Sequence, residues 1–501
     1  MRERLNSKPD ETLSKFILMP VLEDDSLRSL ENMMTANEAH IIMLVKQGLL
    51  RREAAQKLCE ACISLKEEGP SGLEMSTDYE DLYFNIEQYI IKKTGSDIGG
   101  KMHVARSRND LNATVARMNA RTALFRICRS FNKMRKNLLC IAEDNISTIF
   151  TAYTHSQPAQ PTSFSHYILA LVEAFERDFD RLMFSYKHLN LSPLGSGALG
   201  GTSFNIDRNY TAKLLGFDGL VYNSIDAIAS RDYLLEITAA YSTMASNINR
   251  FVYDLYIWSS YEHHYVEVTD SLAACSSIMP QKKNPITFEH IKAKTSHMVS
   301  AFVDLHACMK NIPYSHCRDI GSDLTHAFWD ASEEIYRVLE LLNATLSGMS
   351  LNTERMEKIA NENFSTVTEL ADELVRQNNL PFRIAHAVVG EIARECIIAD
   401  KSVREITVDM LNSSLSNRGL TKVSWEQDFL SNLLSARNVV SKQISHGAPC
   451  GEECKIMNCK SSSRLNQDNL WLENVTASLE AARQMRENAI NSIISNKGDI
   501  Q

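Results

Sequence analysis

Long runs without glycine or proline are the feature that most constrains the fold of this chain. Neither residue occurs between Leu220 and Met279, and comparable runs cover residues 102–157, 286–312 and 322–347. Within the first run, large apolar residues recur at spacings of three and four: Leu234, Ile237, Tyr241, Met244, Ile248, Phe251, Leu255 and Trp258. Such spacing places one apolar stripe along a helix. The sequence therefore predicts an all-α fold with a central bundle of long helices.

Smaller helical regions flank the predicted bundle. At 501 residues the chain is longer than one hydrophobic core usually serves, so more than one structural region is expected. A helical region late in the chain contains Pro381, which marks a turn between two helices. The last thirty residues are typical of an amphipathic terminal helix. We predict an N-terminal domain at 1–105, the bundle at 106–357 and a C-terminal helical domain with the terminal helix at 358–501.

Charge and composition argue against several classes of partner. The chain carries 53 Lys and Arg against 62 Asp and Glu, a net charge of −9, which disfavours nucleic acid and anionic membranes as main partners. No stretch approaches the length of uncharged apolar sequence that a membrane span needs. The 11 cysteines are odd in number and no apolar segment follows the first residues, so we expect reduced thiols and a cytoplasmic location.

Polar turn segments near the ends of the long runs carry the candidate chemistry, and each has two interpretations. In "HVARSRND", Arg108 and Asn109 match the oxygens of a dianion, but a solvated helix start capped by Asn109 or Asp110 fits equally. In "YTHSQPAQP", His155 titrates in the range useful for proton transfer, although a lone histidine is more often structural. In "SSIMPQKKNP", Lys282 is suited to activate a serine, or the segment is an exposed loop.

A late cysteine cluster does not predict a metal site. Cys450, Cys454, Cys459 and His446 lie close together in "HGAPCGEECKIMNC", but their spacing matches none of the usual zinc-binding pairs. The sequence also lacks a phosphate-binding P-loop, a nucleophile elbow and a dinucleotide fingerprint. We therefore expect no metal at this cluster.

Six segments occur in a fixed order over roughly residues 30 to 450: "GGKMHVARSRND", "YTHSQPAQPTSFSHYILA", "PLGSGALGGTSFNIDR", "NSIDAIASRDYLLE", "SSIMPQKKNP" and "ELADELV" followed by "PFRIAH". Together they resemble the argininosuccinate lyase family of the fumarase/aspartase superfamily. The resemblance implies a homotetramer built on a bundle of long helices, with each active site shared by three subunits. It also implies β-elimination without a cofactor: a base removes a proton beside a carboxylate, an aci-carboxylate dianion forms, and the amine leaves to give fumarate.

The resemblance also assigns roles to individual residues. It implies that Ser276 is the general base, which nearby positive charge and backbone donors must activate. Lys282 and Asn284 are implied to hold the carboxylate that takes up charge, and His155 is implied to pair with Glu289 on the leaving-group side. The residues implied to bind the succinyl carboxylates or to stand beside the base are Ser107, Arg108, Asn109, Thr154 and Ser277.

Departures from the family pattern concentrate at positions that the family associates with the arginine half of its substrate. Where the family has "AYNRDLQEDK", this chain has "SHCRDIGSDL", so His316, Gly321 and Leu324 replace Tyr, Gln and Lys. Met19 stands about where an N-terminal serine is expected, and Tyr83 replaces a histidine. The segment "LNATV" also follows "RSRND" where "QVATD" is usual. The fumarate-side residues are retained, so the identity of the leaving amine is the open question.

The sequence therefore predicts a carbon–nitrogen lyase that eliminates fumarate from an N-substituted aspartate, with argininosuccinate the expected substrate and arginine biosynthesis its setting. Its partners are then a small anionic substrate and other copies of the chain, with neither nucleic acid nor membrane. Two alternatives stay open: another N-succinyl amine such as ethylenediamine-disuccinate, and a non-catalytic role like that of the crystallins that share this fold. The intact Ser276, His155, Lys282 and Glu289 weigh against the second.

Overall fold

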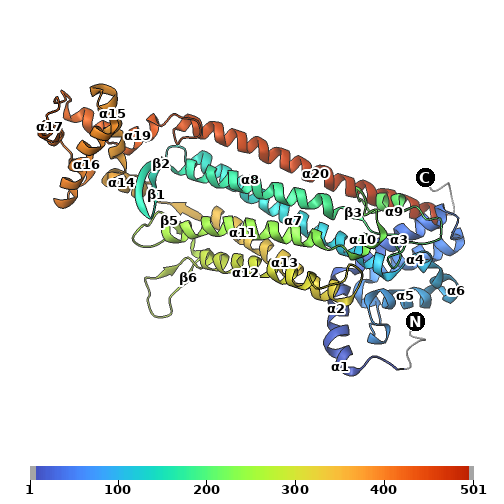
Figure 1. Ribbon diagram of the computed structural model, residues 1–501. Helices are drawn as coiled ribbons and strands as arrows, with labels where there is room; N and C mark the ends of the chain where they lie inside the picture. The colour runs from blue at the N-terminus through green and yellow to red at the C-terminus, as the bar shows by residue number, and fades with distance from the viewer. Residues whose placement is uncertain (1–6, 496–501) are drawn as a thin grey trace.

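The computed structural model describes residues 7–495, and it confirms the all-α class. Six long helices lie side by side as an elongated bundle (Figure 1). All eight residues of the predicted apolar stripe are buried, where each large side chain contributes roughly 1.5–3 kcal/mol to folding. The bundle helices are α7 (Arg108–Asp144), α8 (Phe164–Leu189), α11 (Asp232–Trp258), α12 (Ile286–Met309), α13 (Ser322–Ser347) and α20 (Gly451–Ser495).

A second apolar core lies at the end of the bundle where α7 begins (Figure 1). It joins the N-terminal helices to the start of α7 and to the last turns of α20, where Ala489, Ile490 and Ile493 are buried. The helices of this end are α1 (Glu11–Leu13), α2 (Met19–Arg28), α3 (Leu30–Lys46), α4 (Arg52–Glu68), α5 (Leu82–Thr94), α6 (Ser96–Gly99), α9 (Arg208–Leu214) and α10 (Ser224–Ala229). A π-helical turn, Ser14–Leu18, joins α1 to α2.

The C-terminal helices form a separate core at the opposite end (Figure 1). Pro381 lies between two of them, at the turn that the sequence predicts. The helices of this core are α15 (Val367–Asn378), α16 (Phe382–Ile398), α17 (Val408–Asn417) and α18 (Gln427–Leu433). Beside it, α14 (Thr353–Glu362) and α19 (Ala436–Lys442) pack against each other and against Ile149. The terminal helix α20 instead packs along α7 and α8 and reaches α4. The division into three domains remains a prediction, and α20 spans the length of the bundle.

Four short two-stranded sheets occur in the connections of the described residues. Three are antiparallel: β1 (Ile149–Thr154) with β2 (Gln157–Ser163), β5 (Val266–Val268) with β8 (Met349–Leu351), and β6 (Ala274–Cys275) with β7 (Lys283–Asn284). One is parallel: β3 (Leu191–Ser192) with β4 (Gly219–Leu220). Short 3₁₀ turns complete the connections: Gly69–Gly72, Thr77–Tyr79, Gly100–His103, Asp270–Leu272, Arg318–Ile320, Phe364–Thr366 and Val403–Glu405. The sheets close turns and build no layer of their own.

The length of α7 sets the separation of the polar turns. Its 37 residues rise about 1.5 Å each, so the helix is about 55 Å long. The "RSRND" segment lies at its first turn, and the β1–β2 hairpin follows its last turn (Figure 1). At that far end the rings of Phe150, Phe164, Tyr167 and Trp258 pack against one another. Within one chain, these two turn segments therefore lie at opposite ends of the bundle.

Candidate active site

The first turn of α7 is closed by a capping box. The Ser107 hydroxyl accepts a hydrogen bond from the backbone N–H of Asn109 at 3.2 Å, and the Asp110 carboxylate accepts one from the backbone N–H of Ser107 at 3.0 Å. Ser107 is therefore the N-cap, whereas the structural interpretation of this segment had placed the cap at Asn109 or Asp110. The box holds Arg108 and Asn109 on the first turn, where the helix dipole favours an anion.

Asp110 also ties this turn to the glycine-rich segment "PLGSGALGG". Its second carboxylate oxygen accepts hydrogen bonds from the backbone N–H groups of Gly195 at 2.9 Å and Gly197 at 3.0 Å. Both glycines have positive φ, and a Cβ on Gly197 would lie 2.6 Å from the carbonyl oxygen of Gly201. Asp110 is fully buried; burial raises its pKa to about 6, and the nearby Arg106 acts in the opposite direction. The glycine-rich segment therefore serves to position the "RSRND" turn.

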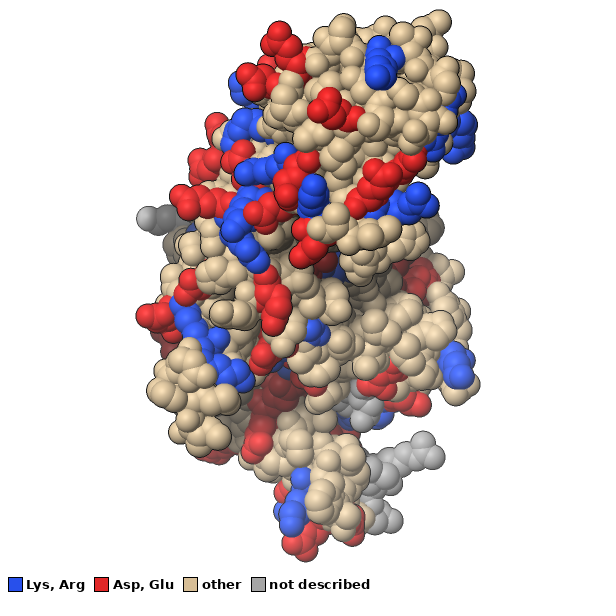
Figure 2. All heavy atoms as spheres, turned by 90° about the vertical axis from the view of Figure 1, so that its left-hand side faces the viewer, with Lys and Arg blue, Asp and Glu red and all other residues tan. Residues whose placement is uncertain are grey.

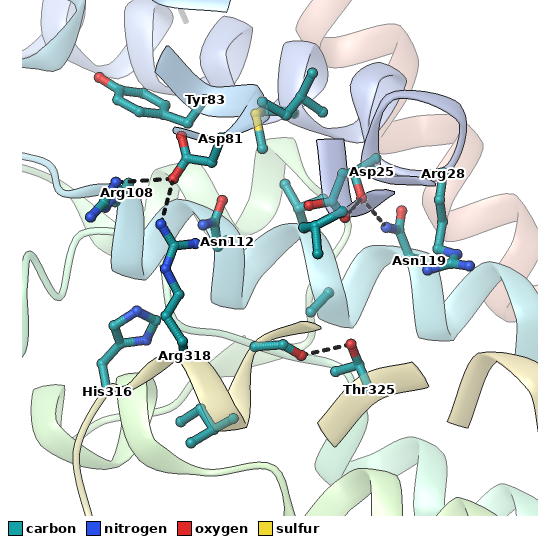
Figure 3. A pocket seen from close by; sticks show the side chains of 18 of the residues that line it. Asp25, Arg28, Asp81, Tyr83, Arg108, Asn112, Asn119, His316, Arg318 and Thr325 are labelled. Carbon is teal, nitrogen blue, oxygen red and sulfur yellow. Dashed lines mark hydrogen bonds and ion pairs between the residues drawn. The ribbon is translucent and has the colours of Figure 1, made fainter. Parts of the chain in front are cut away.

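A deep pocket opens beside this turn and is lined within a single chain (Figure 3). Its walls come from α2, α3, the start of α5, one face of α7, Arg231 at the start of α11 and the connection from α12 to α13. The cavity encloses about 110 Å³ below its open mouth, less than the roughly 300–1,000 Å³ typical of sites that enclose a whole ligand. Of the ten site residues that the sequence predicts, Arg108 lines it.

Charged groups gather at the end of the pocket near Arg108 (Figure 3). The Arg108 guanidinium lies 3.1 Å from the Asp81 carboxylate and 3.3 Å from that of Glu80, and the Arg318 guanidinium lies 3.8 Å from Asp81. Burial lowers the pKa of His316, and the charges of Arg231, Arg318 and Arg108 lower it further. Cations outnumber anions at this end, as a site for carboxylates requires.

The family departures are divided between this pocket and the apolar cores. His316, Gly321 and Tyr83 line the pocket. Leu324 is only 1% exposed and packs in the bundle core, and Met19 packs against the N-terminal core. The structure therefore gives three of the five departures direct access to a bound ligand, whereas Leu324 and Met19 have none within one chain.

Thr154 and His155 lie in the β1–β2 hairpin at the other end of α7. Thr154 pairs with Gln157, so His155 and Ser156 form a two-residue turn, and both have positive φ, 53° and 58°. Turns of this geometry usually contain glycine or asparagine, because other side chains are strained there. The hairpin accepts this strain at an exposed histidine, as functional sites often do.

The signature segment is a second exposed loop, closed by β6 and β7. The Ser276 hydroxyl accepts hydrogen bonds from the backbone N–H groups of Met279 at 3.0 Å and Ile278 at 3.4 Å. These donors are of the kind that stabilises a serine alkoxide. Lys283 forms ion pairs with Glu267 and Asp270 at the base of the loop, and Lys282, the residue before β7, is exposed. The other predicted residues here are Ser277, Asn284 and Glu289, the last in the first turn of α12.

One chain does not bring all of the predicted site residues together. Arg108 lies at the start of α7, whereas His155 follows its far end, about 55 Å away along the helix. The signature loop follows α11, and it projects from the bundle at the end near the hairpin (Figure 1). Within residues 7–495, no hydrogen bond or ion pair joins Ser276 to His155 or Arg108.

Several pocket residues were not singled out by the sequence. Asp25, Asp81, Arg231 and Trp329 line the pocket but come from four segments that are far apart in the chain. The sequence offered a hint only for the arginines: Arg231 and Arg318 each stand before an aspartate, in "SRD" and "CRD". That signal does not indicate which pairs face one cavity, because the helix packing decides it.

Other features bear on metals and membranes. In the part of the chain that the structure describes, no group of three or more His, Cys, Asp or Glu side chains is arranged to hold a metal ion. Among the described residues none of the 11 cysteines forms a disulfide bond, and the buried Cys454 thiol contacts the Ser163 hydroxyl at 3.4 Å.

Between residues 7 and 495 no helix combines the length and apolar character needed to cross a membrane. On the face of Figure 2, acidic and basic side chains are interspersed.

Comparison with known structures identifies the fold. A variant of EDDS lyase with bound fumarate has a TM-score of 0.86 and 27% identity, covering 98% of this chain and 97% of that one. EDDS lyase in complex with formate superposes equally well. A fumarate lyase from Mesorhizobium sp. BNC1, with a TM-score of 0.70 and 15% identity, covers 88% of this chain and 97% of its own and shares the fold.

Sequence comparison identifies the family. A lyase family profile matches residues 23–299, and an argininosuccinate lyase C-terminal profile matches residues 364–441. Argininosuccinate lyase 1 of Shouchella clausii is 38% identical over 482 residues, 96% of this chain and 97% of that protein. Argininosuccinate lyase of Methanocaldococcus jannaschii is 39% identical over 373 residues, 74% of this chain and 77% of that protein. The chain is a carbon–nitrogen lyase and belongs to the argininosuccinate lyase family.

Proposed function

We propose that this protein eliminates fumarate from argininosuccinate and releases arginine. The observation that carries the proposal is the pocket, which begins at Arg108 and is open to a long ligand beside the anion-binding turn of α7. The relatives named as argininosuccinate lyases match it over nearly the whole chain. The bound fumarate and formate in EDDS lyase support a small anionic ligand. EDDS lyase itself supports the second candidate, another N-succinyl amine.

In this proposal, Ser276 removes the proton beside the carboxylate, and the N–H groups of Ile278 and Met279 stabilise its alkoxide. Lys282 and Asn284 hold the carboxylate that gains charge, and Ser277 stands beside the base. The remaining residues bind the succinyl group or act on the leaving side: Ser107, Arg108, Asn109 and Thr154, with His155 paired to Glu289. The carbon–nitrogen bond then breaks, and its electrons leave with the amine.

The proposed active protein is a homotetramer whose sites are shared between subunits. The 55 Å length of α7 supports sharing, because one chain cannot place Arg108 and His155 on the same substrate. Exposed apolar side chains on the bundle helices support association, since a large apolar surface is costly in water. They include Phe184, Tyr253, Val299, Val303 and Leu470, which are 51–57% exposed. The 11 cysteines, which form no disulfide bond in the described residues, support a cytoplasmic location, where arginine biosynthesis is the proposed setting.

Substrate assays test the reaction. The purified protein is mixed with argininosuccinate, adenylosuccinate and ethylenediamine-disuccinate in turn, and fumarate is followed by its ultraviolet absorbance. We expect the highest kcat/KM with argininosuccinate. A preference for ethylenediamine-disuccinate would establish the second candidate, and no fumarate from any of the three would revive a non-catalytic role.

Mixing of inactive variants tests the sharing of sites. Arg108→Ala and Ser276→Ala chains are denatured together and reassembled, and fumarate release is compared with that of each variant reassembled alone. In mixed assemblies, some sites receive neither substitution, so we expect activity to return in part. A mixture that stays inactive, although light scattering shows mixed tetramers, would contradict sharing between subunits.

A further inference from the structure

The Asp25 carboxylate lies in the wall of the pocket, and Arg28 is the one cation that faces it among the described residues. Among the described residues it takes part in no ion pair, and its one hydrogen bond, from the Ser29 hydroxyl, is 3.5 Å long. A partly buried carboxylate that lacks a partner is costly, because it has lost water and gained little in return. Burial and the neighbouring Asp24 raise the pKa of Asp25 to about 6. The fold therefore keeps an unsatisfied negative charge facing the cavity.

The neighbouring polar groups are engaged elsewhere. The Arg28 guanidinium forms two hydrogen bonds with Asp24, at 2.7 and 2.9 Å, and lies 4.6 Å from the centre of the Trp329 ring. The Asn119 amide donates to the Ser29 hydroxyl at 3.1 Å. Figure 3 shows Asp25, Arg28 and Asn119 together at one end of the pocket. Arg28 acts on Asp25 only at a distance, because its hydrogen bonds go to Asp24, so an ion-pair partner for Asp25 can come from the ligand.

Neither position 321 nor position 324 supplies a cation to this pocket. Gly321 lines the pocket without a side chain. Leu324, at the position of the family lysine, is 1% exposed in the bundle core and offers no cation. At this end of the described wall, the cation nearest Asp25 is Arg28, which is paired with Asp24, so the Asp25 carboxylate is the group that lacks an ion-pair partner.

The two ends of the pocket differ in charge and are separated along α7. Arg108, Asn112 and Asn119 line it from one face of that helix. Arg108 and Asn119 are eleven residues apart, which is about 16 Å along the axis. The cationic end, with Arg108 and Arg318, is suited to the succinyl group. The Asp25 end lies where the far end of a long leaving amine would reach.

We propose that Asp25 binds an ammonium group at the far end of the leaving amine, and that a carboxylate next to that ammonium is not recognised there. The substrate class is an N-succinyl guanidine or amine that ends in a primary ammonium. This inference rests on the proposed function in one respect: the leaving amine occupies this pocket. Beyond that function, we infer that the ammonium group of the leaving amine determines which amines bind, and that the carboxylate next to this ammonium does not.

Three product analogues separate these groups. Arginine has both the ammonium and the carboxylate, agmatine has only the ammonium, and 5-guanidinovalerate has only the carboxylate. Binding of each to the wild-type protein is measured by calorimetry at pH 7.5 with fumarate present. A charge-assisted contact corresponds to about a 10- to 100-fold difference in Kd, so we expect arginine and agmatine to bind similarly and 5-guanidinovalerate 10- to 100-fold more weakly.

Two variants of α2 locate the effect. Asp25→Asn should weaken arginine and agmatine binding by 10- to 100-fold and leave 5-guanidinovalerate unchanged, whereas Asp25→Glu should keep the preference for the ammonium. The matched control is Glu23→Gln, which removes the same charge from an exposed position of the same helix outside the pocket wall. Circular dichroism checks folding. If Asp25→Asn does not fold, the wild-type series decides alone.

The inference and the proposed function fail separately. Tight binding of 5-guanidinovalerate, or arginine binding that Asp25→Asn leaves unchanged, would overturn the role of Asp25 even if argininosuccinate is a good substrate. Binding of none of the three analogues would also overturn it. The proposed function instead fails if argininosuccinate gives no fumarate, and the calorimetry does not depend on turnover.

Discussion

The two halves of the proposed site are built in opposite ways. The walls of the leaving-amine pocket are packed helices of one chain. The fumarate half is divided among turns at both ends of the bundle, two of which are exposed loops. The difference implies that one chain can supply the amine pocket, whereas the proposed chemistry requires several chains.

The largest expected effect separates these halves directly. Ser276→Ala should lower kcat for fumarate release about a thousandfold, because it removes the proposed base. The arginine affinity of the pocket should stay within twofold of wild type, since Ser276 does not line it. Stopped turnover assays and calorimetry on the same preparation measure both. Substantial residual activity would show that another group is the base.

Asp110 affects both halves of the proposed site, because this buried residue positions the turn that carries Arg108. Asp110→Ala leaves the N–H groups of Ser107, Gly195 and Gly197 without their acceptor. We expect a loss of about 2 kcal/mol in unfolding free energy and a rise in KM of about 10- to 100-fold with a smaller change in kcat. Steady-state kinetics and urea denaturation measure these changes. Asp144→Asn, an exposed change at the other end of α7, is the control and should be silent.

A purely structural role for Asp110 predicts a different pattern. In that case the variant would lose stability, but the fraction that remains folded would keep its wild-type KM. Partial restoration of KM by Asp110→Asn, which retains one acceptor oxygen, would support the positioning role. Equal losses in kcat and KM for both variants would count against it.

Gly321→Gln tests the amine half without touching the fumarate half. It restores an amide that the family associates with arginine, and its Cβ would lie 3.1 Å from the Arg318 carbonyl oxygen, a close contact that the turn must accommodate. We expect about a five- to tenfold lower KM for argininosuccinate, the value of one added hydrogen bond, with kcat within twofold. Inhibition by fumarate should be unchanged. A higher KM would indicate that the natural amine differs from arginine.

The smallest expected effect is the stability cost of Asp25. Its folded pKa of about 6 lies above its ordinary value of 3.8, so the native state holds the proton more tightly than the unfolded state does. The carboxylate therefore destabilises the fold above pH 6, and this cost shrinks as the pH falls towards 4. The charges facing it are Asp24, Arg28 and Asp81.

It follows that Asp25→Asn should stabilise the protein at pH 7.5 by about 1 to 2 kcal/mol and by only about a third as much at pH 4.5. Thermal denaturation at the two pH values measures the difference, with Glu23→Gln as the control. The ammonium preference of the wild-type pocket should also fade below pH 6. A variant that is less stable at pH 7.5 would mean that Asp25 has a native partner after all.

Local sequence patterns predicted the helical fold class and the polar segments of the proposed site, because each depends only on residues that are close together in the chain. The apolar stripe from Leu234 to Trp258 is buried as its spacing predicts, since a helix presents every third or fourth residue to one side. The "RSRND" and "SSIMPQKKNP" segments fold as a capped helix start and a loop whose serine meets backbone donors. Neither outcome needs information from distant parts of the chain.

Tertiary structure alone decided which residues share a cavity. The sequence placed Leu324 and Met19 with the amine-binding departures, but helix packing turned Leu324 into the bundle core and Met19 towards the N-terminal core. It also brought Asp25 into the pocket of Arg108 and set His155 about 55 Å from that arginine along α7. Helical periodicity specifies which face of a helix is apolar, whereas the neighbours of that face depend on how all the helices pack.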